Sequence, residues 1–341
     1  MSNTFPTLLE EAALSGLPEI PVLDVGADFP LETLERESAR AHALFDEATR
    51  HVPRSLLKAA DAVSRRWLVH SRNPHLRVMD AIAARLGRSG AYYLNVNYEW
   101  GCTAGLKVCP ERKTARLVRV LDWPTAGLGR SVVAACVRGA AGPFVTLTWP
   151  GYTGVLQALA PGRFAAAINQ PPMRKLGGGV FPLDWFMNRI RVWRSTHLPP
   201  SHVLRTVFET AADYAEAKRI LTRTPLAAPA IFSLAGLNEH EMCIVERMED
   251  EAHVCDGPAA AANHWRRPGW SGHARGIDSA GRGRMMEQAA PDFDPTFAWL
   301  RPPVRNDLTR LAMIADPAQR RLLAQGYEAD GPATRPLQLA V

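Results

Sequence analysis

The sequence predicts an α+β fold in which helices and mainly antiparallel strands form separate layers. Helix-like and strand-like blocks follow one another in the order helices, strands, helices, strands. The sequence has no internal repeat, and it lacks the regular strand–helix alternation that a doubly wound parallel sheet would require. Its 341 residues, 47% of them hydrophobic, are enough for one large domain or two small ones.

The first 90 residues have mainly helical patterns. Apolar residues recur at positions i, i+3, i+4 and i+7 in residues 56–67 and 76–86, as one face of a helix requires. We expect Ser55 to cap the first of these helices and Gly87 to end the second. A further helical pattern, rich in charge pairs, covers residues 30–50.

Short β-rich runs separated by turn residues begin at Cys102 and predict a meander of antiparallel strands. The first strands are expected at residues 102–109, 115–123, 131–138, 142–149 and 163–169. A helical block then covers 183–223 and is broken at Pro199 and Pro200. The remaining elements are strands at 229–236, 241–248, 251–255 and 308–316, with a loop rich in Gly and Arg at 266–284.

Composition argues against several classes of partner. The net charge is +6, but the arginines are scattered and their densest group lies in a Gly-rich segment, so we expect no nucleic acid partner. No apolar stretch reaches the roughly 18–20 residues of a membrane span, which leaves at most peripheral membrane contact. The N-terminus lacks a basic signal segment and the cysteines number five, so we expect a cytoplasmic protein with free thiols.

Common catalytic and metal signatures are absent from the sequence, including GxxxxGK[ST], HExxH and GxSxG. Lys175 precedes the glycines 177–179 instead of following them, which is typical of a surface turn and not of a phosphate loop. His240 and Cys243 lack a second ligand pair at zinc spacing. We therefore expect no metal site and no cofactor.

The most informative segment is YLNVNYEWGCT at residues 93–103, where the helical pattern gives way to a strand pattern. Arg119 and Asp122 follow Cys102 in the next expected strand. On an ideal strand these two residues point to opposite faces, so a bulge or a strand end is needed to bring both to one site. From these residues alone, Cys102 is either a small core residue or a nucleophile, and the Arg–Asp pair is either structural or functional.

The run YLNVNYEWGCT followed by Arg-x-x-Asp resembles the processing junction of acid ceramidase and of the N-acylethanolamine-hydrolysing acid amidase. These are cysteine-type N-terminal nucleophile (Ntn) hydrolases of the choloylglycine hydrolase-like superfamily. The resemblance extends in order from about residue 90 to residue 320. Further similar segments lie at residues 149–170, 224–247, 263–265 and 303–319.

The resemblance implies a four-layer αββα sandwich of two antiparallel sheets flanked by helices. It also implies that the precursor cleaves itself between Gly101 and Cys102. The helical piece 1–101 and the catalytic piece 102–341 would then stay associated as one globular unit. A glycine before the nucleophile is expected either to ease a strained turn beside the scissile carbonyl or to form an ordinary turn.

The resemblance further implies that Cys102 forms a thioester with an acyl chain, and that its own freed α-amine accepts the thiol proton. Asp122 would hold this amine. Arg119 would sit beside the nucleophile, favouring the thiolate and binding a carbonyl or head group of the substrate. Asn263 would donate a hydrogen bond to the oxyanion.

A second site arginine is expected shortly after Asn263, and Arg282 is our choice over Arg275 and Arg284. Asn169 is either a second donor near the site or a strand-end turn residue. Glu99 either assists self-cleavage or is a solvated carboxylate.

The activity implied is hydrolysis of a linear amide bond in an N-acylated small molecule, such as an N-acyl amide or ceramide-like lipid. Two alternatives remain open: an acyltransferase that uses the same thioester, and a non-catalytic binding protein that retains the fold. Because the sequence shows no targeting signal, the lysosomal setting and the disulfides of acid ceramidase are not carried over.

Overall fold

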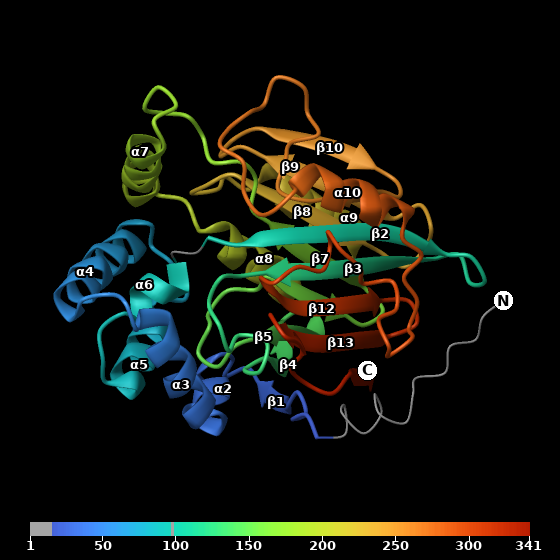
Figure 1. The fold of residues 1–341 in the computed structure, drawn as a ribbon, viewed down its shortest axis with the longest axis horizontal. Coiled ribbons are helices and arrows are strands. Elements are labelled where there is room, and N and C mark those ends of the chain that lie inside the picture. The colour runs from blue at the N-terminus through green and yellow to red at the C-terminus, as the bar shows by residue number, and fades with distance from the viewer. Residues whose placement is uncertain (1–15, 97–98) are drawn as a thin grey trace.

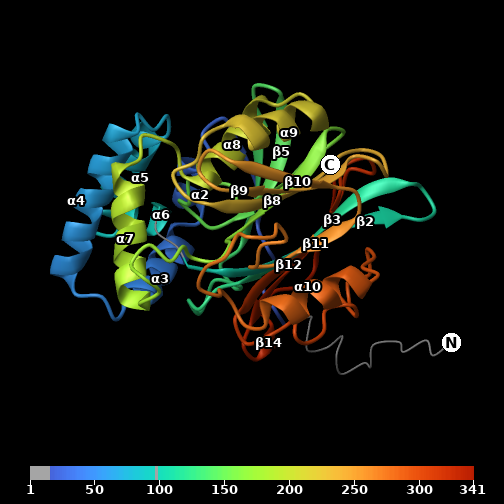
Figure 2. The same cartoon turned by 90° about the horizontal axis from the view of Figure 1, so that it is seen from above.

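The structure is a computed structural model that describes residues 16–96 and 99–341 (Figure 1). Asn97 and Tyr98 of the junction segment, and residues 1–15 of the N-terminus, lie outside the described residues. Two β-sheets pack face to face, and helices cover their outer faces. Figure 2 shows the resulting layers, with α8 and α9 on one side and α10 on the other.

The first sheet has eight strands, all antiparallel except for the parallel pair β1–β4. Their order is β1 (Val22–Gly26), β4 (Val133–Gly139), β5 (Gly142–Thr148), β6 (Gln157–Ala160), β7 (Phe164–Asn169), β8 (Ala230–Ala235), β9 (Met242–Arg247) and β10 (Ala252–Asp256). The second sheet has seven strands and is antiparallel. Its order is β11 (Ala259–Ala261), β2 (Gly101–Cys109), β3 (Thr114–Asp122), β12 (Thr309–Asp316), β13 (Arg321–Glu328) and β14 (Gly331–Pro332), with β15 (Leu337–Ala340) also pairing β13.

The helices form three groups. Those at one end of the sandwich are α2 (Leu31–Arg36), α3 (Ser38–Thr49), α4 (Arg54–His70), α5 (Leu76–Leu86), α6 (Ala91–Val96) and α7 (Phe181–Arg194). The outer face of the first sheet is covered by α8 (Pro200–Thr210) and α9 (Tyr214–Arg223). The helix on the second sheet is α10 (Ser279–Gln288), which packs on β2 and β11. The expected αββα sandwich is confirmed.

The core lies between the sheets, where β2 and β3 face β7 and β8. Every residue of β7, whose sequence is FAAAIN, is buried. Its three alanines add little side-chain bulk between the two sheets. This stacking brings the start of β2, the middle and end of β3 and the end of β7 into one buried region.

Most expected elements are present, with local errors. Gly87 ends α5 in a left-handed conformation, as expected, and the break at Pro199–Pro200 separates α7 from α8. Ser55 is not the cap of α4, which begins at Arg54 after Pro53. The helical pattern at 30–50 is divided into α2 and α3 at Glu37.

Two kinds of element were missed. The short strands β1, β6 and β11 and the C-terminal strands β13 to β15 were not expected, since β6 and β11 are short and alanine-rich and β13 carries a glycine. The expected loop at 266–284 ends in α10, whose first turn is capped by the Asp278 carboxylate accepting from Gly281 N–H. Within residues 16–96 and 99–341, no helix combines the length and apolar character needed to cross a bilayer.

Candidate active site

Cys102 lies at the start of β2, fully buried between the two sheets. Its Sγ atom is 2.8 Å from Nη2 of Arg119 and 3.9 Å from the carbonyl oxygen of Ile168. In the sheet, Arg119 pairs with Ala104, two residues after Cys102. Because side chains two residues apart share a face of a strand, Cys102 and Arg119 are diagonal neighbours on the face toward β7.

Asn169, the last residue of β7, fixes the position of Arg119. Its Oδ1 accepts a hydrogen bond from Nη1 of Arg119, while its Nδ2 donates to the carbonyl oxygens of Ala261 and Ala262, both at 3.1 Å. The side-chain N–H groups of Asn169 are therefore engaged by the backbone. In this geometry Asn169 holds the guanidinium and does not point a donor at Cys102.

The backbone of Cys102 is held by Asn263 and Arg282. The N–H of Cys102 donates to Oδ1 of Asn263 at 2.8 Å, and Nη2 of Arg282 donates to the same oxygen at 2.8 Å. Nη1 of Arg282 donates to the carbonyl oxygen of Cys102 at 2.7 Å and to Oγ1 of Thr103 at 2.9 Å. Nδ2 of Asn263 donates to the Gln170 carbonyl at 2.6 Å. Asn263 thus presents an acceptor, where a donor was expected.

Asp122 is the last residue of β3 and pairs directly with Gly101. Its carboxylate lies 3.3 Å from Nη1 of Arg282 and accepts hydrogen bonds from Oγ1 of Thr309 at 2.9 Å and Nδ2 of Asn306 at 3.1 Å. The pairing of β3 with β12 shifts register between Thr309 and Leu311, opposite this residue. On an ideal strand Arg119 and Asp122 would point to opposite faces. The end of β3 and the register shift beside it bring both residues to one site, as expected.

Gly101 is a strand residue, so the expected turn is wrong. It is absent from the glycines with positive φ among the described residues. An added Cβ would lie 3.3 Å from Cβ of Asp122 and 3.4 Å from Cα of Gly276. Glycine is therefore suited to this position because other chain segments approach closely, and not because the backbone is strained.

Burial controls the electrostatics of this cluster. It raises the pKa of the Cys102 thiol to about 12, although the neighbouring Arg119 guanidinium opposes the rise. Burial also lowers the pKa of Arg119 and raises the pKa of Asp122, the latter opposed by Arg282. The thiol of the intact chain is therefore protonated at neutral pH, with a cation in contact.

The other two arginine candidates and Glu99 lie outside this cluster. Glu99 forms ion pairs with Arg275 and, at 3.0 Å, with Arg189. Nη1 of Arg275 also donates to Oε1 of Gln170 at 3.2 Å. Arg284 is exposed on α10. Of the three candidates only Arg282 contacts Cys102, which agrees with our choice.

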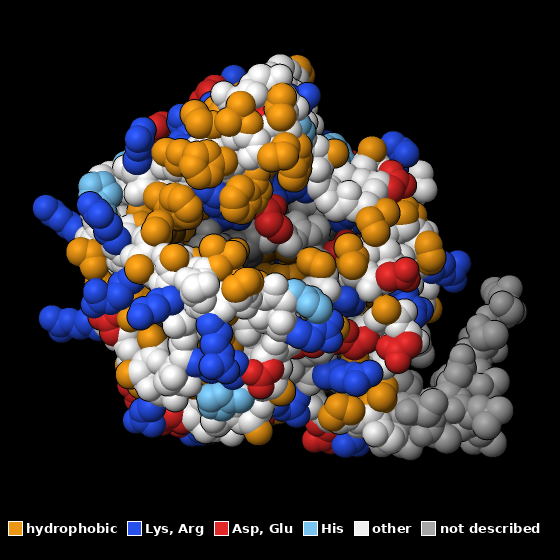
Figure 3. All heavy atoms as spheres, turned by 60° about the vertical axis from the view of Figure 1, so that its left-hand side comes forward, with side chains coloured by type: hydrophobic (Ala, Val, Ile, Leu, Met, Phe, Trp, Pro, Cys, Tyr) orange, Lys and Arg blue, Asp and Glu red, His pale blue; other side chains and the backbone are white. Residues whose placement is uncertain are grey.

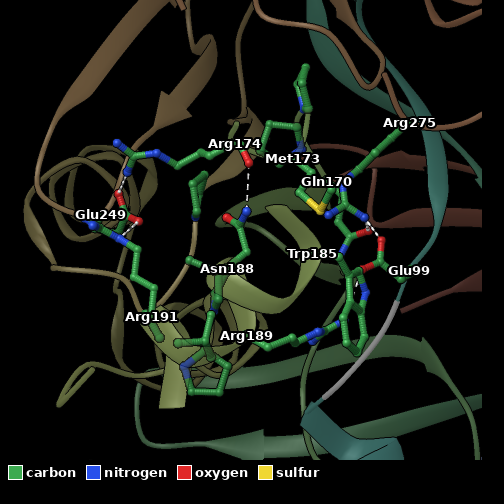
Figure 4. Close-up of a pocket in the computed structure, with 18 of the residues that line it drawn as sticks. Glu99, Gln170, Met173, Arg174, Trp185, Asn188, Arg189, Arg191, Glu249 and Arg275 are labelled. Atoms are coloured by element: carbon green, nitrogen blue, oxygen red, sulfur yellow. Dashed lines mark hydrogen bonds and ion pairs between the residues drawn. The ribbon is translucent and has the colours of Figure 1, made fainter. Parts of the chain in front are cut away.

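Two cavities adjoin the junction, and Figure 3 shows the face with α4 and α7 hollowed and ringed by hydrophobic side chains. An apolar cavity of about 330 Å³ is lined by residues that include Trp123, Leu128, Trp149 and Tyr152. The arginine pocket, of about 100 Å³ (Figure 4), is lined by residues that include Gln170, Met173, Asn188, Arg191 and Arg275. Both are lined by Glu99, Trp185 and Arg189.

Trp100, two residues before Cys102, packs against a residue that lines the apolar cavity. Its ring stacks on Trp123 with centroids 5.2 Å apart, and its backbone N–H donates to Oε1 of Gln170 at 3.0 Å. Trp100 is buried, and Cys102 lines neither cavity. In the intact chain, a buried residue of the junction thus packs beside the wall of the apolar cavity, and the thiol does not line that cavity.

No family model matches this chain. Acid ceramidase of Homo sapiens is 33% identical over 109 residues, which are 32% of this chain and 26% of that protein. This chain resembles acid ceramidase. Acid ceramidase of Macaca fascicularis is likewise 33% identical over 110 residues, again 32% and 26% of the two chains. The matched segment spans about a quarter of the length of these relatives.

A solved structure extends the likeness to the fold. The N-acylethanolamine-hydrolysing acid amidase ortholog of Caenorhabditis elegans superposes with a TM-score of 0.51 and 21% identity, over 70% of this chain and all of that chain. The chain thus has the Ntn-hydrolase fold of that amidase. The resemblance to acid ceramidase and to this amidase, expected from the junction, is confirmed.

Several residues of this site were not anticipated. They are Thr103, Gln170, Asn306, Thr309 and Gly276. Gln170 directly follows Asn169, and Thr103 directly follows Cys102, so sequence adjacency was a usable signal for these two. Asn306, Thr309 and Gly276 lie in loops or at a register shift, where no periodic pattern indicates direction.

The two metal candidates lie in strand β9 and in the turn before it. His240 is exposed and Cys243 is buried in β9, where burial raises its pKa to about 11. In the part of the chain that the structure describes, no three His, Cys, Asp or Glu side chains come together as metal ligands would.

Proposed function

We propose that this chain is a self-processing amidase that hydrolyses the linear amide bond of an N-acylated small molecule through a thioester on Cys102. One observation carries the proposal: the buried thiol contacts a guanidinium, while the nitrogen and the carbonyl of the same residue are held by Asn263 and Arg282. A structural cysteine needs none of these contacts, whereas a nucleophile whose own amine acts as base is helped by a cation at its sulfur and by an acceptor at its nitrogen.

In the self-processing step, the thiol of Cys102 attacks the carbonyl carbon of Gly101. A C–S bond forms, the C–N bond breaks, and the thiol proton goes to the departing nitrogen, which becomes the α-amine. Water then hydrolyses this thioester, leaving a carboxylate on Gly101 and a free thiol on Cys102. Asn263 supports the step because its Oδ1 already accepts from the nitrogen that must become the amine.

In the amidase step, the α-amine takes the thiol proton and the thiolate attacks the acyl carbonyl of the substrate. The amide C–N bond breaks, the leaving amine takes the proton back, and water hydrolyses the acyl thioester. We assign Asn263 and Asp122 to holding the α-amine. Arg119 stabilises the thiolate it contacts, and Asn169 positions Arg119.

The acyl chain fits the apolar cavity. Trp123 lines this cavity, and the ring of Trp100, the residue before Gly101, stacks on Trp123. Cleavage after Gly101 frees the end of the segment that carries Trp100, so this ring can leave and connect cavity and thiol. Exposed apolar residues at the start of α7 provide a surface for lipid contact beside it: Val180, Phe181, Leu183, Phe186 and Met187.

We also propose that the pieces 1–101 and 102–341 stay associated after cleavage. A buried polar network crosses between them: Nδ2 of Asn73 and Oγ1 of Thr153 each lie 2.9 Å from a ring nitrogen of His202. Oδ1 of Asn95 accepts from the backbone N–H of Thr153 at 2.7 Å. Strand β1 also pairs with β4 of the other piece. Separation of the pieces would leave these buried polar groups without hydrogen-bond partners, which costs a free energy of about 1–3 kcal/mol for each group.

The experiment is a fatty-acid release assay on purified protein, with a ceramide and an N-acylethanolamine as substrates. Wild type should release the acid, and Cys102→Ala should not. Addition of an amine acceptor tests the acyltransferase alternative, because a new amide would then replace the free acid. Absence of any acyl release, with protein that is folded and cleaved, would overturn the proposal.

A further inference from the structure

The arginine pocket beside the scissile bond carries more positive than negative charge. Its charged lining residues are Arg174, Arg189, Arg191, Arg275, Glu99 and Glu249. Glu249 already pairs with Arg174 at 2.6 Å and with Arg191 at 2.8 Å. Glu99 is therefore the one carboxylate among these lining residues that is shared by Arg189 and Arg275 (Figure 4).

The Glu99 carboxylate and the two arginines that it pairs with belong to different pieces of the self-cleaved chain. Glu99 lies two residues before Gly101, on the free end that self-cleavage would create. Arg189 and Arg275 belong to the piece 102–341. Once that end moves, the two guanidiniums lose the carboxylate that they share in the intact chain.

Arg275 is placed close to the reacting bond. The next residue, Gly276, packs against Gly101, and a Cβ on Gly276 would collide with Nη2 of Arg282 and lie 3.1 Å from Oδ1 of Asn263. The Arg275 side chain is only 18% exposed, and burial lowers its pKa to about 10. A largely buried guanidinium without an anion is costly, so a replacement anion is favoured.

The cluster of buried residues around Cys102 supplies no such anion. Asp122 is already engaged by Arg282, Thr309 and Asn306. Arg119 and Arg282 outnumber this one carboxylate as well. The site therefore gains net positive charge when Glu99 leaves.

We propose, resting on the amidase function above, that the amine half of the substrate carries a carboxylate, as in an N-acyl amino acid. Arg275 binds this carboxylate where Glu99 lies in the intact chain, with Arg189 beside it. The planar guanidinium can hold a carboxylate with two parallel hydrogen bonds. The acyl chain occupies the apolar cavity, so the scissile amide lies between the two. Water cleaves this amide to a fatty acid and a free amino acid.

The test uses two substrates that share one acyl chain, N-lauroylglycine and N-lauroylethanolamine, which differ in a terminal carboxylate or hydroxymethyl group. Processed wild type should have a kcat/KM at least tenfold higher for N-lauroylglycine. Arg275→Gln should lose at least tenfold with N-lauroylglycine, mainly through KM, and change less than threefold with N-lauroylethanolamine. Arg284→Gln, an exposed arginine on α10, should change neither.

The outcomes separate this inference from the proposed function. Equal or faster hydrolysis of N-lauroylethanolamine by wild type would overturn the carboxylate site and leave the amidase standing. An equal loss with both substrates in Arg275→Gln would also overturn it. Hydrolysis of neither substrate by folded, processed wild type would overturn the amidase itself. Arg275→Gln could fail to fold or to process. In that case the inference is still tested by two measurements: the ratio of the two kcat/KM values in wild type, and the same ratio in Arg275→Lys, which should still favour N-lauroylglycine.

Discussion

The Sγ atom of Cys102 lies 2.8 Å from Nη2 of Arg119, although Arg119 pairs in the sheet with Ala104. The guanidinium reaches the thiol diagonally along one face of the second sheet. Asn169 from the first sheet fixes the guanidinium from the other side. The surroundings of the thiol are therefore set by how the two sheets stack, and not by the local sequence around Cys102.

Arg119 should be needed for the chemistry more than for the fold. Arg119→Met keeps an unbranched, apolar side chain but removes the cation, so we expect a loss of about a hundredfold or more in the kcat/KM for amide hydrolysis. Arg116→Met is the matched control, because Arg116 lies on the same strand and its Nη2 is 2.8 Å from Sγ of another cysteine, Cys109. A similar loss in both variants would contradict a specific role for Arg119.

Asn263 should matter for cleavage through its acceptor oxygen. Asn263→Ala removes the acceptor of the Cys102 N–H and of Arg282, so self-cleavage should slow by about tenfold or more. Asn263→Asp keeps an oxygen at that position and should retain more of the rate. A time course of intact mass measures both, and cleavage of Asn263→Ala at the wild-type rate would contradict the assignment.

Gly101→Ala should disturb the junction without unfolding the chain. The new Cβ would lie 3.3 Å from Cβ of Asp122, so the strands must separate by a few tenths of an ångström. We expect a stability loss of about 1–3 kcal/mol and a clearly slower cleavage. Urea unfolding and intact mass measure the two effects, and an unchanged cleavage rate would argue against close packing at the scissile bond.

The intact chain should contain an unreactive thiol. With the pKa of Cys102 raised to about 12, about one thiol in 10⁵ is ionised at pH 7. As long as the pH stays below the pKa, each increase of one pH unit raises the ionised fraction about tenfold. Iodoacetamide labelling of uncleaved Asn263→Ala, followed by peptide mapping, should therefore find Cys102 almost unlabelled at pH 7. Rapid labelling of Cys102 in uncleaved protein would show that the thiol is not buried there.

The buried histidines should make stability depend on pH. Burial lowers the pKa of His75 to about 3 and puts the pKa of His202 well below its usual value. Both are neutral in the folded chain, whereas unfolded histidine gains a proton near pH 6.5. Their contribution to the free energy of unfolding is therefore complete above pH 6.5. It is lost as the pH falls below 6.5, by about 1.4 kcal/mol per pH unit for each histidine.

Urea unfolding at pH 7 and pH 5 measures this slope. His75→Phe should reduce it, since the ring of His75 packs edge-on against His202 at 5.0 Å and the variant removes one proton-binding group. His240→Gln, at an exposed position, is the control and should leave the slope unchanged. An identical slope in wild type and His75→Phe would contradict the assignment to the buried pair.

The sequence was informative where patterns are periodic or where motifs are contiguous. The strands around Cys102 and Arg119 were expected within one or two residues of β2 and β3, because hydrophobic runs bounded by turn residues mark strands. Their ordered resemblance to acid ceramidase also directed attention to Asp122. The register shift beside Thr309 depends on the partner strand, and no pattern within one strand reveals it.

Side-chain orientation was the other limit. Asn263 was expected to donate to an oxyanion, but Arg282 and the Cys102 N–H both need an acceptor and thereby fix its oxygen toward the nucleophile. Gly101 was expected in a turn, and its close approach to Gly276 from a distant loop was not visible in the sequence. Glu99 was expected at the junction, and its pairing with Arg189 and Arg275 depends on tertiary contacts.

The most direct test is the intact mass of wild type beside that of Cys102→Ala, both purified under conditions in which circular dichroism shows them folded. Wild type should give two masses, matching residues 1–101 and 102–341 with a new N-terminal cysteine, while Cys102→Ala should give one mass for the whole chain. A single full-length mass for folded wild type would contradict self-processing at Gly101–Cys102.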